Sequence, residues 1–113
     1  MFVKELTNQE EFALVNGGER LEDGIRSVYC CDLLSLVMGR APSGCAWVTV
    51  MGNVNSIAVA VLADISCVVL AEGAVFDDIA LKRAKEKGVV LFRTEDTVFN
   101  AARRIHKLLG DND

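Results

Sequence analysis

Residues 46–92, AWVTVMGNVNSIAVAVLADISCVVLAEGAVFDDIALKRAKEKGVVLF, decide the fold class of this chain. Short apolar runs at 46–50, 67–70 and 89–92 begin about 21 residues apart, and stretches of helical character separate them at about 56–63 and 77–87. Continuously apolar strands that alternate with helices are typical of parallel strands buried on both faces. The pattern therefore predicts an α/β fold, a single layered domain with a mainly parallel sheet and helices on both faces.

The flanking segments extend this alternation in both directions. A last helix is expected at 95–109, and an amphipathic segment at 3–12 precedes a strand at 13–15 and a turn at 16–18. A further strand is expected at 25–30, after which Asp32 is predicted to cap a short helix at 33–38 that ends at Gly39. The helix at about 56–63 is apolar all round, which predicts burial on every side.

Length and charge limit what the chain can do. Its 113 residues, 51% hydrophobic and 25% charged, fit one domain over 1–113. Sixteen acidic against twelve basic residues give a net charge of -4, which disfavours nucleic acid and anionic membranes as partners. The N-terminus lacks the pattern of a signal peptide, and Asp64 interrupts an apolar stretch already too short to span a bilayer. We therefore expect a soluble, cytoplasmic protein.

Charge is distributed unevenly along the chain. The segment 25–76 carries only five charged side chains, namely Arg26, Asp32, Arg40, Asp64 and Glu72. Such a segment is either core or partly an oligomer interface, because interface centres are depleted of charge. We favour a contribution from an oligomer interface.

The cysteines and the single histidine give no sign of a metal or redox centre. Cys30, Cys31, Cys45 and Cys67 form no C-x-x-C pair and no cluster with histidine, so neither a metal nor a cofactor is expected. We interpret the four cysteines as small buried residues in a reducing compartment. His106 is expected on the surface of the last helix, and Trp47 in the core or in an interface.

Candidate ligand-binding residues follow the three regular strands. In parallel α/β sheets, ligands bind beyond the carboxyl ends of the strands, where helix N-termini offer free N–H groups. The loops at 51–56, 71–74 and 93–97 are predicted to lie there, and their glycines and polar residues are the candidates: Gly52, Asn53, Asn55, Ser56, Gly73, Thr94, Asp96 and Thr97. Asn53, Asn55 and Ser56 suit helix capping as well as ligand binding, and Thr94 suits a structural helix cap.

Known catalytic motifs are missing from the sequence. It contains no G-x-x-x-x-G-K-[ST], no G-x-G-x-x-G after a strand and no G-x-S-x-G. We therefore expect no catalytic residue and no enzyme activity. A small transferase or kinase-like enzyme that uses Asp32 or Asp96 as a base is the least favoured alternative.

Three segments, VYCCDLLSLVM (28–38), NSIAVAVL (55–62) and GVVLFRTEDTVF (88–99), resemble the stand-alone DRTGG-domain family. The resemblance covers 16–105, although only Asp23 and Arg26 hint at the naming motif, and Asn53-Val54-Asn55 stands where relatives often carry His-Pro-Asn. Related domains occur in phosphotransacetylases and between CBS domains of pyrophosphatases, and they resemble the N-terminal domain of HPr kinase. The resemblance implies an α/β fold, a homodimer and a regulatory role, with a signalling or redox-enzyme partner protein.

These observations together predict a non-catalytic regulatory or ligand-sensing module. It would bind a small anionic ligand, such as an adenine nucleotide, as a homodimer. The alternative is a protein-interaction or dimerisation module that has no ligand.

Overall fold

The computed structural model describes residues 1–110, which build a five-stranded sheet in the order β1-β5-β4-β3-β2. Strands β2 to β5 run parallel, and β1 pairs antiparallel with β5. The fold class predicted from the sequence is confirmed. In chain order the elements are the 3-10 helix η1 (Val3–Asn8), β1 (Ala13–Asn16), the 3-10 helix η2 (Glu19–Glu22), β2 (Ser27–Cys30), α1 (Leu34–Arg40), β3 (Cys45–Thr49), α2 (Val54–Leu62), β4 (Cys67–Leu70), α3 (Asp78–Lys87), β5 (Leu91–Arg93) and α4 (Val98–Leu108).

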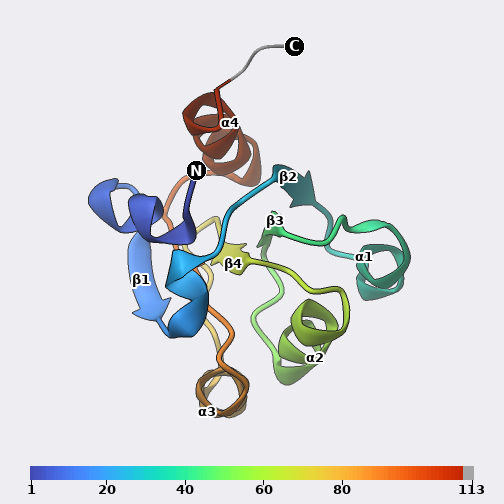
Figure 1. Ribbon diagram of the computed structural model, residues 1–113. Coiled ribbons are helices and arrows are strands. Elements are labelled where there is room, and N and C mark those ends of the chain that lie inside the picture. The colour runs from blue at the N-terminus through green and yellow to red at the C-terminus, as the bar shows by residue number, and fades with distance from the viewer. Residues whose placement is uncertain (111–113) are drawn as a thin grey trace.

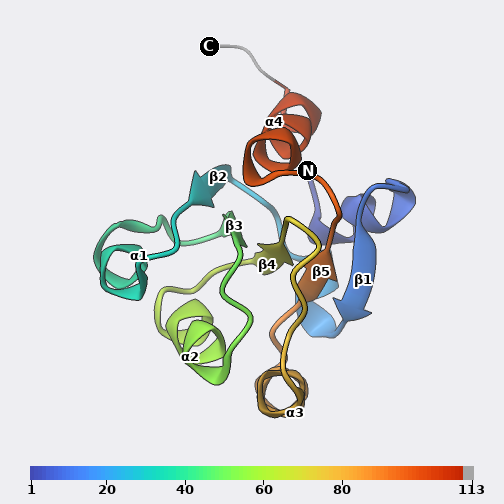
Figure 2. The same cartoon turned by 180° about the vertical axis from the view of Figure 1, so that it is seen from behind.

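Helices cover both faces of the sheet (Figures 1 and 2). Helices α1, α2 and α3 lie together on one face, and α4 covers the other near the N-terminal segment. The strands β2 to β5 stand in sequence order, so successive crossovers all run in one direction across the sheet. Because such crossovers are right-handed, their helices gather on the same face.

Two hydrophobic clusters fill the space on either side of the sheet. Trp47 and Leu70 belong to the cluster under α1, α2 and α3, whereas Val48 and Val69 belong to the cluster under α4. Neighbouring residues of a strand point to opposite faces, so β3 and β4 need apolar residues at nearly every position. This double burial explains the apolar runs at 46–50 and 67–70.

The N-terminal half departs from the prediction at the ends of its elements. Residues 3–8 form a 3-10 helix in place of a longer amphipathic segment, and η2 was not predicted. Helix α1 has Leu33 at its N-cap without a side-chain bond, and it continues through Gly39 to Arg40. Asp32 therefore does not cap α1.

Helix α2 is not buried on every side, which corrects the expectation from its apolar sequence. Ile57 and Ala60 are buried, but Val61 and Leu62 on its outer side are 44% and 69% exposed. The sequence of α2 is apolar where it faces the core and also where it faces solvent.

All four cysteines are free thiols, and only two are buried as predicted. Cys45 and Cys67 lie in the core, and burial raises the pKa of both thiols, that of Cys45 to about 11. Cys30 is exposed and Cys31 is half-buried, since they follow one another at the end of a strand on the border of the sheet. Trp47 is a core residue, and its indole Nε1 donates to the Cys31 carbonyl oxygen at 2.9 Å.

Among the helices of residues 1–110, none combines the length and the apolar character that a membrane span requires.

Candidate functional site

The three candidate loops lie together at the carboxyl ends of the parallel strands. The loop after β4 is bonded to the loop after β5, because the Glu72 N–H donates to the Asp96 carbonyl oxygen at 2.8 Å and the Gly73 N–H donates to that of Thr94 at 3.1 Å. It is also bonded to the loop after β3, through the Asp77 N–H and the Gly52 carbonyl oxygen at 3.0 Å. The loops thus form one continuous layer of backbone along these strand ends.

Gly52 is required by packing inside this layer. A Cβ atom at Gly52 would lie 2.6 Å from the Val75 carbonyl oxygen and 2.9 Å from Leu70 Cδ2. The close approach that glycine permits here is therefore between two loops of the protein itself.

The start of α2 holds three candidate residues in different roles. Asn53 is the N-cap, and its Oδ1 accepts a hydrogen bond from the Ser56 N–H at 3.1 Å. The buried Ser56 hydroxyl donates to the Met51 carbonyl oxygen at 2.5 Å. Asn55 is exposed, and in the part of the chain that the structure describes, no protein group accepts a hydrogen bond from the Val54 or Asn55 N–H.

The candidates in the loop after β5 hold that loop in shape. Thr94 is buried, and its Oγ1 accepts a hydrogen bond from the Asp96 N–H at 3.1 Å. The Asp96 carboxylate accepts from Arg104 Nε at 2.7 Å. The sequence suggests a helix cap at Thr94, but Thr94 does not cap α4.

The N-cap of α4 is Thr97, whose Oγ1 accepts from the Asn100 N–H at 3.0 Å. A carboxylate from another loop also lies at this helix end, because Glu72 Oε2 accepts from the Val98 N–H at 2.8 Å. The start of α3 is occupied in the same way by its own N-cap, since Asp77 Oδ1 accepts from the Ala80 N–H at 2.8 Å. Within residues 1–110, α2 is thus the one helix following β3, β4 or β5 whose first N–H groups meet no carboxylate.

Gly73 serves the turn after β4. Its φ of 69° lies in the left-handed region that favours glycine, and a Cβ there would lie 3.2 Å from the Glu95 carboxylate oxygens. The Arg93 guanidinium donates to the carbonyl oxygens of Gly73 and Ala74 at 3.2 and 2.9 Å. This turn is held by an arginine whose hydrogen bonds go to the protein backbone.

Both aspartates considered as catalytic bases are bonded within the protein. Asp32 Oδ1 accepts from Thr49 Oγ1 at 2.7 Å and from the Val50 N–H at 3.1 Å, which ties the end of β2 to the end of β3. Asp96 holds Arg104, as described above. Each carboxylate therefore has a structural task.

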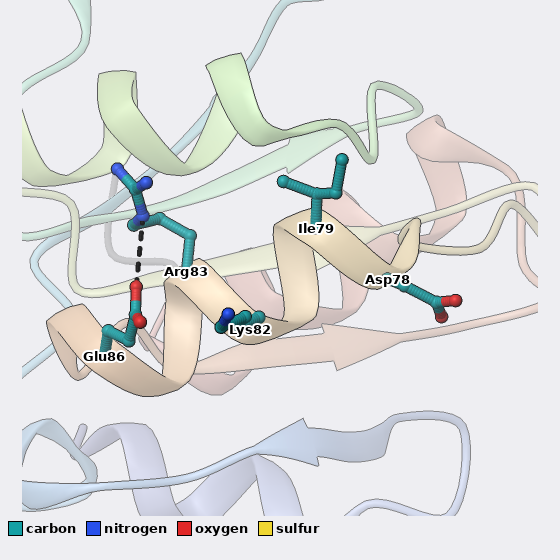
Figure 3. A pocket seen from close by; sticks show the side chains of 5 residues that line it. All are labelled: Asp78, Ile79, Lys82, Arg83 and Glu86. Atoms are coloured by element: carbon teal, nitrogen blue, oxygen red, sulfur yellow. Dashed lines mark ion pairs between the residues drawn. The ribbon is translucent and has the colours of Figure 1, made fainter.

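Surface hollows lie mostly away from the candidate residues. One hollow of about 200 Å³ lies at Thr94, at the carboxyl ends of the strands. Its described lining residues include the carboxylates of Glu10, Glu11 and Glu95 and one cation, Arg93. Another, of about 340 Å³, follows α3, where Ile79 and Arg83 point toward α2 and Arg83 pairs with Glu86 at 3.2 Å (Figure 3).

A polar cluster that the sequence did not indicate lies at the amino ends of the parallel strands. A hollow of about 320 Å³ there is lined by Arg20, Asp64 and Ser43 among others. Arg20 pairs with Asp23 at 2.6 Å and with Asp64 at 3.1 Å. A hydrogen bond from Ser43, with Arg20 nearby, holds the pKa of Asp64 below its ordinary value. The two aspartates balance the charges of Arg20 and Arg26, so this hollow offers no net charge to a ligand.

No model of a known protein family matches this chain, and no curated protein matches it. Among solved structures, it is similar to the CBS and DRTGG domains of the regulatory region of the Clostridium perfringens pyrophosphatase, complexed with the activator diadenosine tetraphosphate. The TM-score is 0.68 at 14% sequence identity, and the match covers 81% of this chain and 40% of that chain. The likeness shows a DRTGG/CBS-like fold.

Proposed function

We propose that this chain is a non-catalytic regulatory module that senses a small anionic ligand, such as an adenine nucleotide, at the start of α2. The observation that carries the proposal is that the Val54 and Asn55 N–H groups at the start of α2 donate to no protein group among residues 1–110. An anion placed there would receive hydrogen bonds from the Val54 and Asn55 N–H groups and would lie at the positive end of the helix dipole. Gly52, Asn53 and Ser56 would shape the loop around it, while Asn55 is exposed and available to the ligand.

The other four proposed ligand-binding residues would serve the site indirectly. Gly73, Thr94, Asp96 and Thr97 fix the neighbouring loops, and the carboxylates of Glu72 and Glu95 lie among them. An anionic ligand is repelled by these carboxylates, which favours the start of α2 over the start of α4.

The fold supports a regulatory role over a catalytic one. The similar structure is a regulatory region, and the nucleotide bound to it is an activator. We further propose that residues 1–113 form one domain of a cytoplasmic protein related to the stand-alone DRTGG-domain family, with a signalling or redox-enzyme partner protein. The sequence resemblance is the argument for the family and for the partner protein.

A homodimer forms part of the proposal. The α2–α3 face, defined by Val61, Leu62 and Ile79, exposes 44%, 69% and 67% of these three apolar residues. Exposed apolar residues gathered on one face are typical of association sites. A charge-free α2 suits the centre of such an interface.

The first experiment is thermal unfolding of the purified protein with adenine nucleotides, diadenosine tetraphosphate, acyl phosphates and phosphorylated metabolites. A ligand at ~100 times its dissociation constant adds about 2.7 kcal/mol to the stability of the native state. In a domain of this size we expect the melting temperature to rise by about ten degrees.

Two matched variants locate the site. Asn55→Asp places a carboxylate at the free end of α2, where it suits the helix dipole but repels an anion, so the ligand-induced shift should disappear. Asn100→Asp makes the same change in the first turns of α4 and should keep the shift. Equal shifts in both variants, or no shift for the wild-type protein with any compound, would contradict the proposed site.

The second candidate function is a dimerisation or protein-interaction module without a ligand. The exposed apolar residues of the α2–α3 face favour it independently of any helix end. A dimeric mass in solution together with the absence of any thermal shift would select this function.

A further inference from the structure

We propose that the outer edge of β2 binds an extended, acidic segment of a partner protein by strand addition. The β2 edge is the outer side of Ser27–Cys30, which within residues 1–110 pairs with β3 alone; just before it, the Ile25 N–H donates to the Met1 carbonyl oxygen at 2.8 Å on this outer side. Figure 1 shows β2 at the border of the sheet, between α4 and α1. This inference goes beyond the proposed ligand site, from which it is separate.

The backbone of β2 presents hydrogen-bonding groups to the outside. The Arg26 N–H, just before the strand, donates inward to the Gly44 carbonyl oxygen at 2.9 Å. Successive N–H groups of a strand point to opposite sides, so the N–H groups of Ser27 and Tyr29 point away from β3. An extended peptide laid along this edge would pair with them.

A hollow beside the β2 edge can receive side chains of the added strand. It measures about 320 Å³ and lies between β2 and α4, with Val28, Cys30, Phe99 and Ala102 as its apolar wall. Phe99 is 72% exposed, although it is a large aromatic residue. Alternate side chains of an added strand point to one face of the sheet, so every second residue would enter this hollow.

Arg103 and Arg40 are cations beside the β2 edge, and the exposed Asp32 lies two residues beyond the end of the strand, in a chain that is acidic as a whole. Arg103 and His106 line the hollow on the α4 side, and no carboxylate is among its described lining residues. On the α1 side, burial raises the pKa of Tyr29 and the nearby Arg40 opposes that rise. Acidic side chains on the added strand would complement Arg103 and Arg40.

The cations of α4 argue against a second copy of this chain as the occupant. Antiparallel pairing of two β2 edges about a two-fold axis would bring α4 of one copy beside α4 of the other. Arg103 and the neighbouring Lys107 would then face their own counterparts, and like charges repel. An acidic segment of another protein meets no such repulsion.

The strand at the other border of the sheet, β1, is protected against strand addition. Strand β1 has a register shift between Leu14 and Asn16, and Glu10 and Glu11 lie close to its beginning. Bulges and charged side chains are the usual devices that prevent strand addition at an edge. Strand β2 has no bulge in its register and no charged residue.

The test is selection of a displayed library of random eight-residue peptides on the purified wild-type protein. We expect enrichment of peptides that are rich in β-formers, carry Asp or Glu and lack proline. Binding of a selected peptide is then measured by fluorescence anisotropy on the variants. Ser27→Pro removes an outward N–H and should weaken binding at least tenfold, whereas Ser27→Ala should not.

Ser27 suits this pair of variants, because its buried Oγ makes no hydrogen bond and proline is tolerated at the first residue of an edge strand. A second pair tests charge: Arg103→Glu should weaken binding of an acidic peptide at least tenfold, and Lys85→Glu on α3 should leave it unchanged. Circular dichroism and melting temperature show that each variant is folded.

Three outcomes would overturn the proposal. They are the absence of any enriched peptide, selected peptides that bind Ser27→Pro and Arg103→Glu as tightly as the wild-type protein, and a dimer that becomes monomeric only on Ser27→Pro. The last would mean that a second copy occupies the β2 edge. The nucleotide-induced thermal shift should be the same in Ser27→Pro and the wild-type protein, so the two proposals can fail separately.

Discussion

At the scale of single residues, glycine has different tasks at two positions of this chain. Gly52 lies against the backbone of the neighbouring loop, so a side chain has no room there. Gly39 lies inside α1 and has no other atom within 4 Å of the position of a Cβ. The same residue type is thus required in the first case and costly to helix stability in the second.

Gly52→Ala should lower the free energy of unfolding by about 1 to 3 kcal/mol, because the added methyl group overpacks the loop against Val75. Gly39→Ala should raise it by up to about 1 kcal/mol, since alanine favours the helix. Urea unfolding of both variants measures the difference. A Gly52→Ala protein as stable as the wild type would show that the two loops separate easily.

The sequence predicts single-residue roles where the signal is local. Asn53 was expected to cap α2 or bind a ligand, and it does accept the hydrogen bond of a cap. Asp32 was predicted as a cap by the same logic, yet its carboxylate bonds to Thr49 and Val50 at the end of the next strand. That contact depends on how β2 and β3 align, which spacing along the chain does not reveal.

At the scale of elements, α2 has two apolar sides with different neighbours. Ala60 is 1% exposed under the sheet, and Leu62 is 69% exposed on the α2–α3 face. Alternation with strands predicted the existence and direction of α2. The apolar pattern could not distinguish its core side from its outer side, because core and interface residues are alike in type.

Substitutions on the two sides of α2 should separate folding from association. Ala60→Glu places an unpaired carboxylate in the core and should lower stability by more than about 3 kcal/mol. Leu62→Glu should leave the fold intact and weaken the proposed dimer at least tenfold. Circular dichroism and solution mass over a range of concentrations measure both effects. If the mass of Leu62→Glu equals that of the wild type at every concentration, the α2–α3 face is not a dimer interface.

At the scale of the whole molecule, Arg20 joins segments that are distant in the sequence. It pairs with Asp23 and Asp64, and its guanidinium donates to the Ile65 carbonyl oxygen at 3.0 Å. Asp64 has a φ of 56°, a left-handed conformation that glycine, asparagine and aspartate adopt more readily than most other residues. Its carboxylate accepts the hydrogen bond from Ser43.

The pKa of Asp64 is lowered in the folded state by Ser43 and then by Arg20. Its contribution to stability is therefore complete above the ordinary pKa of aspartate, about 3.9, and is lost as the pH falls through the lower, folded value. Asp64→Asn should keep the turn. Its free energy of unfolding should fall less steeply than that of the wild type as the pH is lowered. The difference should stay below about 1 kcal/mol at neutral pH, since the pair is largely exposed.

Urea unfolding of both proteins from pH 2 to 7 checks this prediction. Asp64→Ala is the matched control, because it removes the same charge and also strains the backbone. It should be less stable than Asp64→Asn at every pH. If the free energies of unfolding of the wild-type protein and Asp64→Asn fall in parallel as the pH is lowered, the Asp64 carboxylate does not make this contribution.

The order of the strands also sets the order in which the fold can be completed during synthesis. Each of β2, β3 and β4 finds its next partner within one strand–helix unit, so these pairings become possible as soon as that unit has been made. Strand β1 is made first but pairs only with β5, and Ala13 must wait for Arg93. The N-terminal strand is therefore the last to be incorporated, and until then its apolar residues have to be kept from other chains.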